Sequence, residues 1–358
     1  MSYTVGIVGT GQPGNPDRTG FAMAYEHAAG YGKLAECELV ACADIVPENA
    51  ERFAEEHGLP DSAVYESHDA MLADAAPDIV SVTVPPAAHA DIVIDCARAG
   101  VEAVHCEKPM ADTPGDARLM AQECARRGVQ LTINHQRRFG KPFRRARELV
   151  DAGEIGDVTR VEFDAGNLCD YGTHSFDLSN YLVGDRTPEW VLAGIDYHEE
   201  NLWFGMHNEN EGVALWEYPG GVFGFAATGG PGEAAVDCHN RVVGTEGTIE
   251  IGRRTEDAPP LRIRRAGQAD WETVDTDGEG MHGSEYHHRA IADLVECLDA
   301  DREPELRAER ALSATELVFG AWESARRRRR VEFPLAVEEN PLAEMVESGE
   351  IELAPREE

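Results

Sequence analysis

An aspartate and a histidine near the middle of the chain have the types and spacing of an acid/base pair. Asp170 and His174 are four residues apart, so their side chains lie on one face if the segment is helical. Oxidation of an alcohol needs a base that takes the hydroxyl proton as hydride leaves the carbon, and histidine titrates near neutral pH. We expect His174 to move the proton, Asp170 to orient the ring or hold a substrate hydroxyl, and Asp177 to support them. A capping aspartate beside an unrelated histidine is the alternative that this spacing leaves open.

A lysine follows a short apolar segment in the first third of the chain. Lys108 stands in Glu107-Lys108-Pro109, directly after residues 103–106, and is one of only three lysines. Doubly wound sheets bind ligands at the carboxyl ends of their strands, and the loop 83–89 follows the neighbouring strand. An ammonium there stabilises alkoxide character on a substrate oxygen. We expect Lys108 and His174 to meet across one cleft, although a surface Glu-Lys pair at a turn is the simpler alternative.

A glycine-rich segment follows the first apolar run and predicts a dinucleotide site. It has the GxGxxG pattern in the order Gly9-Thr10-Gly11-Gln12-Pro13-Gly14, which is informative because it comes directly after a strand. Gly9 suits the tight turn, and Gly11 suits close approach of a pyrophosphate. Prolines at positions 13 and 16 cannot lie inside a helix, so we expect an enlarged loop over residues 12–18. The third glycine is then Gly14 or Gly20.

Asp44 ends the second expected strand and is the candidate for binding the adenosine ribose. Its carboxylate could accept both ribose hydroxyls, whereas a 2′-phosphate there would meet like charge. This favours NAD. NADP stays open because Arg52 could fold back toward the site, and a purely capping role for Asp44 also stays open.

The chain has two further clusters of charged or metal-ligating residues. His282, Glu285, His287 and His288 offer nitrogen and oxygen ligands, but on a helix adjacent histidines point about 100° apart, so we expect no metal site. The five arginines at 326–330 end an expected helix, where cations complement the carboxyl-end dipole. We expect them to pair with neighbouring acidic residues rather than bind nucleic acid.

The elements that must position these residues form two domains. Expected strands are 4–8, 38–43, 79–84, 103–106 and 130–133, with helices over 20–29, 47–57, 89–99 and 114–127, which is typical of a parallel sheet covered by helices. Later segments at 158–164, 213–218, 222–227 and 248–251 indicate an antiparallel or mixed sheet, with helices over 142–152, 284–300 and 308–326. The sequence predicts an α/β protein with a doubly wound nucleotide-binding domain over 1–134. A second α/β domain spans 135–358, with a loosely held acidic tail from about 338.

The composition excludes several classes of protein. The chain of 358 residues has 32 basic and 67 acidic residues, a formal charge of −35, which would repel a phosphate backbone. Scarce lysine with abundant acid is similar to proteins of extreme halophiles, in which concentrated salt screens self-repulsion. Eight cysteines without CxxC spacing suit buried thiols. Since the start lacks a leader pattern and no run of about 18 apolar residues occurs, we expect a soluble, cytoplasmic protein with no membrane partner.

Taken together, the motifs resemble one family of oxidoreductases. The glycine-rich turn is followed by Pro85-Pro86-x-x-His89, Glu107-Lys108-Pro109, residues 134–139 (NHQRRF) and Asp170-x-Gly172-x-His174-x-x-Asp177. This order is similar to the glucose-fructose oxidoreductase, inositol dehydrogenase and rhizopine-catabolism family, Gfo/Idh/MocA, over nearly the whole chain. The resemblance implies a Rossmann domain and an α/β domain whose large open mixed or antiparallel sheet commonly forms dimers or tetramers. It also implies NAD(P)-dependent chemistry at a carbon of a sugar, sugar acid or cyclitol.

Carried onto this chain, the resemblance assigns roles to single residues. It makes Lys108, Asp170 and His174 catalytic, and it assigns cofactor binding to Gly9, Thr10, Gly11, Gly14, Asp44, Pro85, His89, Glu107 and Lys108. Members differ over whether lysine or histidine moves the proton, and we expect histidine because a lysine is ordinarily protonated near neutrality. The segment 201–210 departs from the family and suits either a sugar site or an interface loop. A cofactor-binding sensor without turnover is the alternative function.

Overall fold

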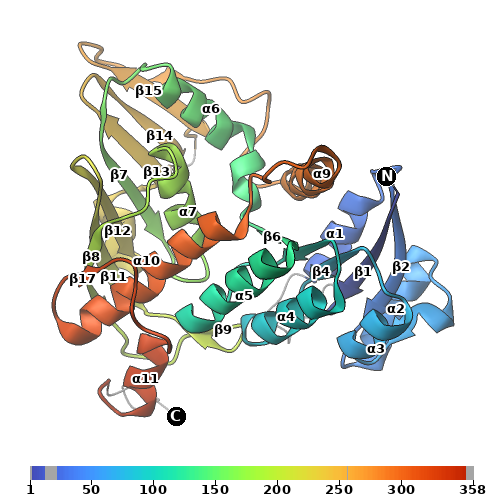
Figure 1. Ribbon diagram of the computed structural model, residues 1–358. Helices are drawn as coiled ribbons and strands as arrows, with labels where there is room; N and C mark the ends of the chain where they lie inside the picture. The colour runs from blue at the N-terminus through green and yellow to red at the C-terminus, as the bar shows by residue number, and fades with distance from the viewer. Residues whose placement is uncertain (1, 13–21, 256, 352–358) are drawn as a thin grey trace. The chain divides into compact units, whose positions relative to one another are not determined.

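The computed structural model describes residues 2–12, 22–255 and 257–351, and its contacts divide the chain into two compact units (Figure 1). Unit 1 comprises Met1–Asp112, Asp116–Gln136 and Ser284–Ala311, and unit 2 comprises Thr113–Gly115, Arg137–Gly283 and Leu312–Glu358. The sequence had assigned residues 284–311 to the second domain, whereas their contacts place them in unit 1. The first long stretch of unit 1 ends at Gln136, and the domain boundary at residues 134/135 stays a prediction.

Unit 1 contains a six-stranded parallel sheet in the order β3-β2-β1-β4-β5-β6. Its strands are β1 Tyr3–Val8, β2 Cys37–Ala43, β3 Val64–Tyr65, β4 Ile79–Val82, β5 Ala103–Cys106 and β6 Gln130–Ile133. The order reverses beside β1, between β1 and β4. In such sheets ligands bind at this switch point, beyond the carboxyl ends of the strands.

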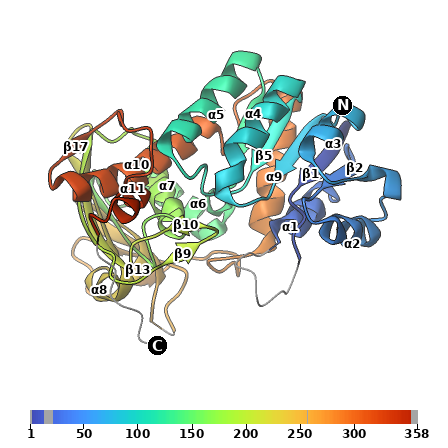
Figure 2. The same ribbon diagram turned by 90° about the horizontal axis from the view of Figure 1, so that it is seen from below.

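Helices cover both faces of this sheet (Figure 2). They are α1 Met23–Tyr31, α2 Pro47–His57, α3 His68–Asp74, α4 His89–Ala99, α5 Pro114–Arg127 and α9 Ser284–Ala300, with short 3₁₀ turns η1 Asp61–Ala63 and η2 Pro86–Ala88. A third 3₁₀ turn, η3 Gln136–Phe139, spans the division between the two units. Proline in the first turn fixes the start of α2, and Gly58 at φ +71° ends it.

Helix α9 belongs to unit 1 because its apolar face packs there. Ile291, Leu294 and Val295 are buried in one cluster with Tyr3, Tyr31 and further residues of β1, β4 and β5. The hydroxyl of Tyr3 also donates to Asp299 at 3.0 Å. A helix 150 residues beyond the expected boundary therefore completes the core of the nucleotide-binding sheet, which local sequence patterns could not reveal.

Unit 2 is built on a nine-stranded mixed sheet in the order β16-β15-β14-β13-β7-β12-β11-β8-β17. The strands are β7 Val158–Ala165, β8 Trp190–Asp196, β11 Glu211–Tyr218, β12 Val222–Thr228, β13 Cys238–Gly244, β14 Gly247–Arg253, β15 Leu261–Arg265, β16 Glu272–Thr273 and β17 Val331–Glu332. Only β7 and β12 pair in parallel, and the other neighbours are antiparallel. A separate hairpin consists of β9 Leu202–Trp203 and β10 Met206–His207.

The helices associated with unit 2 are α6 Lys141–Asp151, α7 Gly172–Leu182, α8 Gly229–Ala235, α10 Ala308–Arg327 and α11 Pro341–Glu347. The prediction of a loose tail from residue 338 is wrong over α11. Asn340 caps this helix by accepting from the backbone N–H groups of Leu342 and Ala343, and Leu342 is fully buried. Its Glu344 also pairs with Arg326 at 2.6 Å.

The expectations for cysteines, for the arginine run and for membrane segments can be compared directly with the structure. All eight cysteines are free thiols, seven of them buried. Arg326 and Arg327 pair with Glu323, and Arg330 pairs with Glu332, as the sequence predicts. Within the described ranges, no helix is both long and apolar enough to span a bilayer.

Candidate functional site

The glycine-rich turn of unit 1 is held by Asp44. Gly9 has φ +88°, and a Cβ there would lie 2.4 Å from a methyl carbon of Val84, so only glycine fits. Asp44 follows β2, and its Oδ2 accepts hydrogen bonds from the Thr10 hydroxyl at 3.1 Å and the Gly11 N–H at 2.9 Å. The predicted cofactor residues Thr10, Gly11 and Asp44 are thus one hydrogen-bonded group, and the Gly9 N–H bonds to the carbonyl of Ala43, the residue before Asp44, at 2.8 Å. Gly14 lies outside the described residues.

Asp44 retains capacity for a ligand. Its other oxygen accepts one bond, from the backbone N–H of Val46 at 2.8 Å. An ionised carboxylate offers about four acceptor positions, so three donors do not saturate it. Ile45, the next residue, is 89% exposed. Arg52, on α2, has a buried Nη1 without a hydrogen-bond partner among the described residues, so the NADP alternative stays open.

Glu107 and Lys108 follow β5, at the same carboxyl edge of the parallel sheet as the glycine turn. The Glu107 side chain is buried, and its Oε1 lies 3.0 Å from His27 Nε2 and accepts from the Asn134 amide at 2.6 Å. Its Oε2 accepts from the Lys108 backbone N–H at 3.2 Å. Burial by itself raises the pKa of Glu107. The hydrogen bond and charge of His27, together with His287 and the Asn134 hydrogen bond, lower it by more, so the pKa of Glu107 is below its usual value. Glu107 is therefore an ionised anchor for the backbone of Lys108.

Three potential metal ligands meet around Glu107. Atoms of His27, Glu107 and His287 lie within 4.8 Å of one another. The Asn134 amide nitrogen lies among them, 3.2 Å from His27 Nε2, 2.6 Å from Glu107 Oε1 and 2.9 Å from His287 Nδ1. Burial lowers the pKa of His287 to about 4 and that of His105 well below its usual range. Hydrogen bonding through a neutral amide accounts for this cluster, and the prediction of no metal site stays a prediction.

His89 and Pro85 shape the loop after β4. Pro85 precedes η2, and His89 opens α4 and is fully buried. The His89 ring nitrogens lie 2.9 Å from the Val84 carbonyl and 3.0 Å from the Pro109 carbonyl, and burial lowers its pKa. The ring thus lies between the loop after β4 and the loop after β5, and a neutral ring donates to one of the two carbonyls. Its predicted contact with a cofactor stays a prediction, and the structure shows the ring holding backbone.

Asp170 and His174 lie at the start of α7 in unit 2. Asp170 precedes the helix in a turn, and His174 is in its first turn; the two residues are 5% and 4% exposed. Gly172 permits this turn, since a Cβ there would lie 2.6 Å from the Asn167 carbonyl oxygen. The helix begins at Gly172, two residues after Asp170. His174 is therefore helical and Asp170 is not, so the side chains of this pair are not related by the spacing of a helix.

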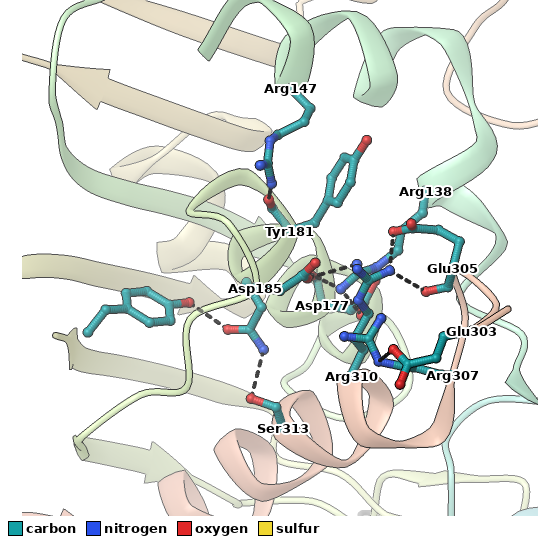
Figure 3. A network of polar contacts seen from close by, with 12 residues as sticks. Arg138, Arg147, Asp177, Tyr181, Asp185, Glu303, Glu305, Arg307, Arg310 and Ser313 are labelled. Atoms are coloured by element: carbon teal, nitrogen blue, oxygen red, sulfur yellow. Dashed lines mark hydrogen bonds and ion pairs between the residues drawn. The ribbon is translucent and has the colours of Figure 1, made fainter. Parts of the chain in front are cut away.

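Asp177, expected to support His174, binds an arginine. Arg138 donates from Nε to one Asp177 oxygen at 2.7 Å and from Nη2 to the other at 2.8 Å, and from Nη1 to Asp185 at 2.9 Å (Figure 3). Arg138 and Asp177 are each 1% exposed. This bidentate pair fixes α7 to the chain that leads into α6, and the sequence named both residues without pairing them.

Sequence reasoning missed several residues that support these groups. Asn208 and Glu209 bind backbone N–H groups of the turn that carries Asp170, and His27 and Asn134 hold Glu107. The sequence offers a sugar site or an interface loop for the segment 201–210, and neither of these describes its support of this turn. Lys108 belongs to unit 1 and His174 to unit 2, so their expected meeting stays a prediction.

Comparisons with known proteins place the chain in a family. Residues 3–135 match the oxidoreductase family model with an NAD-binding Rossmann fold, and residues 147–333 match the C-terminal α/β domain model of the same Gfo/Idh/MocA family. The chain belongs to this family. The resemblance inferred from the motifs is confirmed, as is the expected fold of a parallel Rossmann sheet followed by a mixed α/β domain.

Other Gfo/Idh/MocA proteins show what the chain is similar to. It is 30% identical over 209 residues to D-glucoside 3-dehydrogenase of Escherichia coli, covering 53% of this chain and 56% of that one. It is 24% identical over 247 residues to scyllo-inositol 2-dehydrogenase (NAD(+)) of Bacillus subtilis, covering 64% and 71%. The chain thus spans little more than half the length of the first of these relatives.

Solved structures of low sequence identity share the fold. An aldose-aldose oxidoreductase from Caulobacter crescentus, complexed with glycerol, superposes with a TM-score of 0.75 at 23% identity over 93% of this chain and all of that one. The WlbA dehydrogenase of Bordetella pertussis, in complex with NADH and UDP-GlcNAcA, gives 0.74 at 22% identity over 94% and 100%.

Proposed function

We propose that the protein is an NAD-dependent oxidoreductase that transfers a hydride between the nicotinamide and a hydroxyl-bearing carbon of a sugar, sugar acid or cyclitol. The observation that carries the proposal is Lys108, anchored by the buried Glu107 carboxylate at the carboxyl edge of the sheet that also presents the Gly9–Gly11 turn. Family membership supports it, because curated relatives are named as inositol and glucoside dehydrogenases.

The described residues fit a dinucleotide. The Gly9 turn leaves no room for a side chain, and Asp44 keeps acceptor capacity for ribose hydroxyls while holding Thr10 and Gly11 in place. A negative carboxylate at this position disfavours a 2′-phosphate, so NAD is preferred over NADP. Bound NAD would supply the hydride acceptor or donor. Pro85 and His89 shape the neighbouring loop, and Gly14 is proposed as a further contact.

The chain's own residues would handle the proton and the substrate oxygen. His174 takes the hydroxyl proton during oxidation and returns it during reduction. Asp170 orients the imidazole or accepts a hydrogen bond from a substrate hydroxyl. The Lys108 ammonium stabilises negative charge that develops on the reacting oxygen. Asp170 and His174 are both buried, so little water surrounds them. Electrostatic interactions of their side chains with a substrate are stronger in such an environment than in water.

Steady-state kinetics with single and double variants test these assignments. The screen offers polyols and aldoses with NAD or NADP in molar salt and follows absorbance of the reduced nicotinamide. Lys108→Ala and His174→Ala should each lower kcat by roughly 10²- to 10⁴-fold while NAD affinity changes little. If both act in one transition state, the double variant loses about as much as the worse single variant. Lys33→Ala, at a half-exposed surface pair with Glu285, is the matched control.

Two outcomes would reassign the site. Either variant retaining most of its rate, or fully multiplicative losses in the double variant, would mean that the two groups do not share a step. Asp44→Ala should weaken NAD binding instead, and unchanged affinity would place the ribose elsewhere. Tight NADH binding without turnover of any polyol would favour the silent sensor, but the names of the curated relatives favour an enzyme.

We also propose a homodimer or homotetramer formed through the open face of the unit 2 sheet. Leu192, Val213 and Phe223 are 43%, 49% and 37% exposed on the adjacent strands β8, β11 and β12, and exposed apolar patches of this kind mark interfaces. Val213→Asp should dissociate the oligomer in size-exclusion chromatography with light scattering. Leu119→Asp, at an equally exposed leucine on α5, should not. A wild-type monomer would contradict the proposal.

The proposed setting is the cytoplasm of a cell with concentrated internal salt. The free thiols suit a reducing compartment. The formal charge of −35 suits a medium in which the screening length is about 3 Å at 1 M salt.

A further inference from the structure

The turn that carries Asp170 is bound by side chains from another part of unit 2. Asn208 Oδ1 accepts a hydrogen bond from the backbone N–H of Asp170 at 3.1 Å, and Glu209 Oε1 accepts from the backbone N–H of Leu168 at 2.6 Å. Asn208 and Glu209 follow the β9–β10 hairpin and are 1% and 0% exposed. They are 38 and 41 residues away in sequence from the groups they bind.

The hairpin makes a third contact with the same turn. The ring of Trp203 on β9 meets the ring of Tyr171 nearly edge to face, with centroids 5.7 Å apart. The Trp203 indole N–H donates to Asn201 at 3.0 Å, which fixes the ring on the hairpin. Three residues of the turn, at positions 168, 170 and 171, therefore depend on the segment 201–210.

We propose that Asn208 and Glu209 are positioning residues that hold the 167–171 turn, and with it Asp170 and His174, in the arrangement needed for reaction. The inference rests on the proposed function for its kinetic consequence. It assigns the segment 201–210 a role that neither a sugar-binding loop nor a subunit interface describes.

The backbone of the turn explains why outside support is needed. Buried backbone N–H groups in a turn that precedes a helix need acceptors outside the helical hydrogen bonds. Here Asn167 Oδ1 accepts from the Tyr171 N–H at 3.1 Å, and the Thr173 N–H bonds to the Cys169 carbonyl at 3.0 Å. The N–H groups at 168 and 170 are left to Glu209 and Asn208. Without these acceptors two buried donors would lose their partners, and the turn would have to move to regain them.

The Glu209 carboxylate also fixes the turn to the body of unit 2. Its Oε1 accepts from the Thr228 hydroxyl of β12 at 2.9 Å, and its Oε2 accepts from the Trp322 indole N–H of α10 at 2.9 Å. A carboxylate accepts from all three donors, whereas a glutamine would turn an NH₂ group toward one of them. A buried carboxylate is costly unless it is hydrogen-bonded, so its use here fits the need for three acceptor bonds at one point.

The test compares two asparagines of the same segment in the full-length protein. Asn208→Ala removes the acceptor of Asp170, whereas Asn210→Ala removes an acceptor of the His198 and Glu199 N–H groups, which lie outside the turn. We expect Asn208→Ala to lower kcat by roughly 10- to 100-fold, as for a displaced catalytic group, with NAD affinity unchanged. Asn210→Ala should stay within threefold of wild type. The Asn208 amide also donates to the Met206 carbonyl at 3.1 Å, so the Asn210→Ala variant, rather than a charged replacement at 208, is the control.

Hydrogen exchange separates this inference from the proposed function. Amides in a peptide covering residues 166–172 should exchange at least tenfold faster in Asn208→Ala and Glu209→Ala than in wild type. The exchange rate of the same amides should be unchanged in Asn210→Ala. This readout needs no turnover, so it decides the positioning role even if no substrate is found. Wild-type exchange in Asn208→Ala, or equal kinetic losses in both asparagine variants, would overturn the inference.

Discussion

The buried carboxylate of Glu209 makes the stability of unit 2 depend on pH near neutrality. Burial raises its pKa to about 7 from the usual 4.5, although hydrogen bonds from Trp322, Leu168 and Thr228 oppose the rise. Between these two values the unfolded chain has released the proton and the native state still holds it. Since the native state then binds more protons, stability falls as the pH rises through this window.

The size of the effect follows from the two pKa values. Each pH unit between about 4.5 and 7 costs about 1.4 kcal/mol for one proton, so the total loss is roughly 3 kcal/mol. Above pH 7 both states are ionised, and the penalty stays constant. Glu209→Gln cannot titrate, so its own destabilisation, from an NH₂ facing a donor, does not vary with pH. The difference between wild type and this variant isolates the contribution of Glu209.

Urea unfolding followed by tryptophan fluorescence measures this difference. All five tryptophans belong to unit 2, so the signal reports that unit: positions 190, 203, 216, 271 and 322. At constant high salt, the stability of wild type relative to Glu209→Gln should fall by about 3 kcal/mol between pH 4.5 and 7.5 and then level off. A difference that stays constant within 1 kcal/mol, or that rises with pH, would refute the reasoning.

Three further predictions concern the turn, the ion pair and the salt. Gly172→Ala should destabilise unit 2 by roughly 1–3 kcal/mol, because the added Cβ would clash with the Asn167 carbonyl oxygen. A Cβ at Gly194 would have no neighbouring atom within 4 Å, so Gly194→Ala should cost far less in the same urea assay. Asp177→Asn should cost about 3–5 kcal/mol, because it leaves Arg138 short of its bidentate partner; a loss under 1 kcal/mol would show that this pair is dispensable. The melting temperature should rise from dilute buffer to molar KCl because salt screens the charge of −35, and an unchanged value would remove the halophilic interpretation.

Local patterns were sufficient for many elements of unit 1, but not for β3 and α3, which the sequence did not predict. The bounds of β5, β6, α2, α4 and α5 agree with the ranges expected from sequence. These elements are bounded by turn-forming residues, such as Gly58 and Gly100 at positive φ, whose effect acts over a few residues. Buried parallel strands also form continuous apolar runs, which are easy to find in a sequence.

Strands of unit 2 were harder to find because they carry charges. β13 (CHNRVVG) was not predicted, since Arg241 interrupts the apolar pattern. In the sheet Arg241 lies between Glu162 of β7 and Glu250 of β14, bonded at 2.7 and 3.0 Å. Only the register of three strands, far apart in the chain, brings these charges together. The helix α11 was missed because its acidic sequence suggested solvent, while Leu342 is buried.

By itself, the sequence determined the family and the parallel nucleotide-binding sheet, and it supplied the candidate residues at positions 108, 170 and 174. These follow from periodicity, turn chemistry and motif order, which are encoded over short stretches. The tertiary structure alone decided which residues support them: Asn134 and His27 at Glu107, Arg138 at Asp177, and Asn208 and Glu209 at the turn. Those partners meet only when distant segments pack, because a hydrogen bond depends on distance in space and leaves no spacing in the chain.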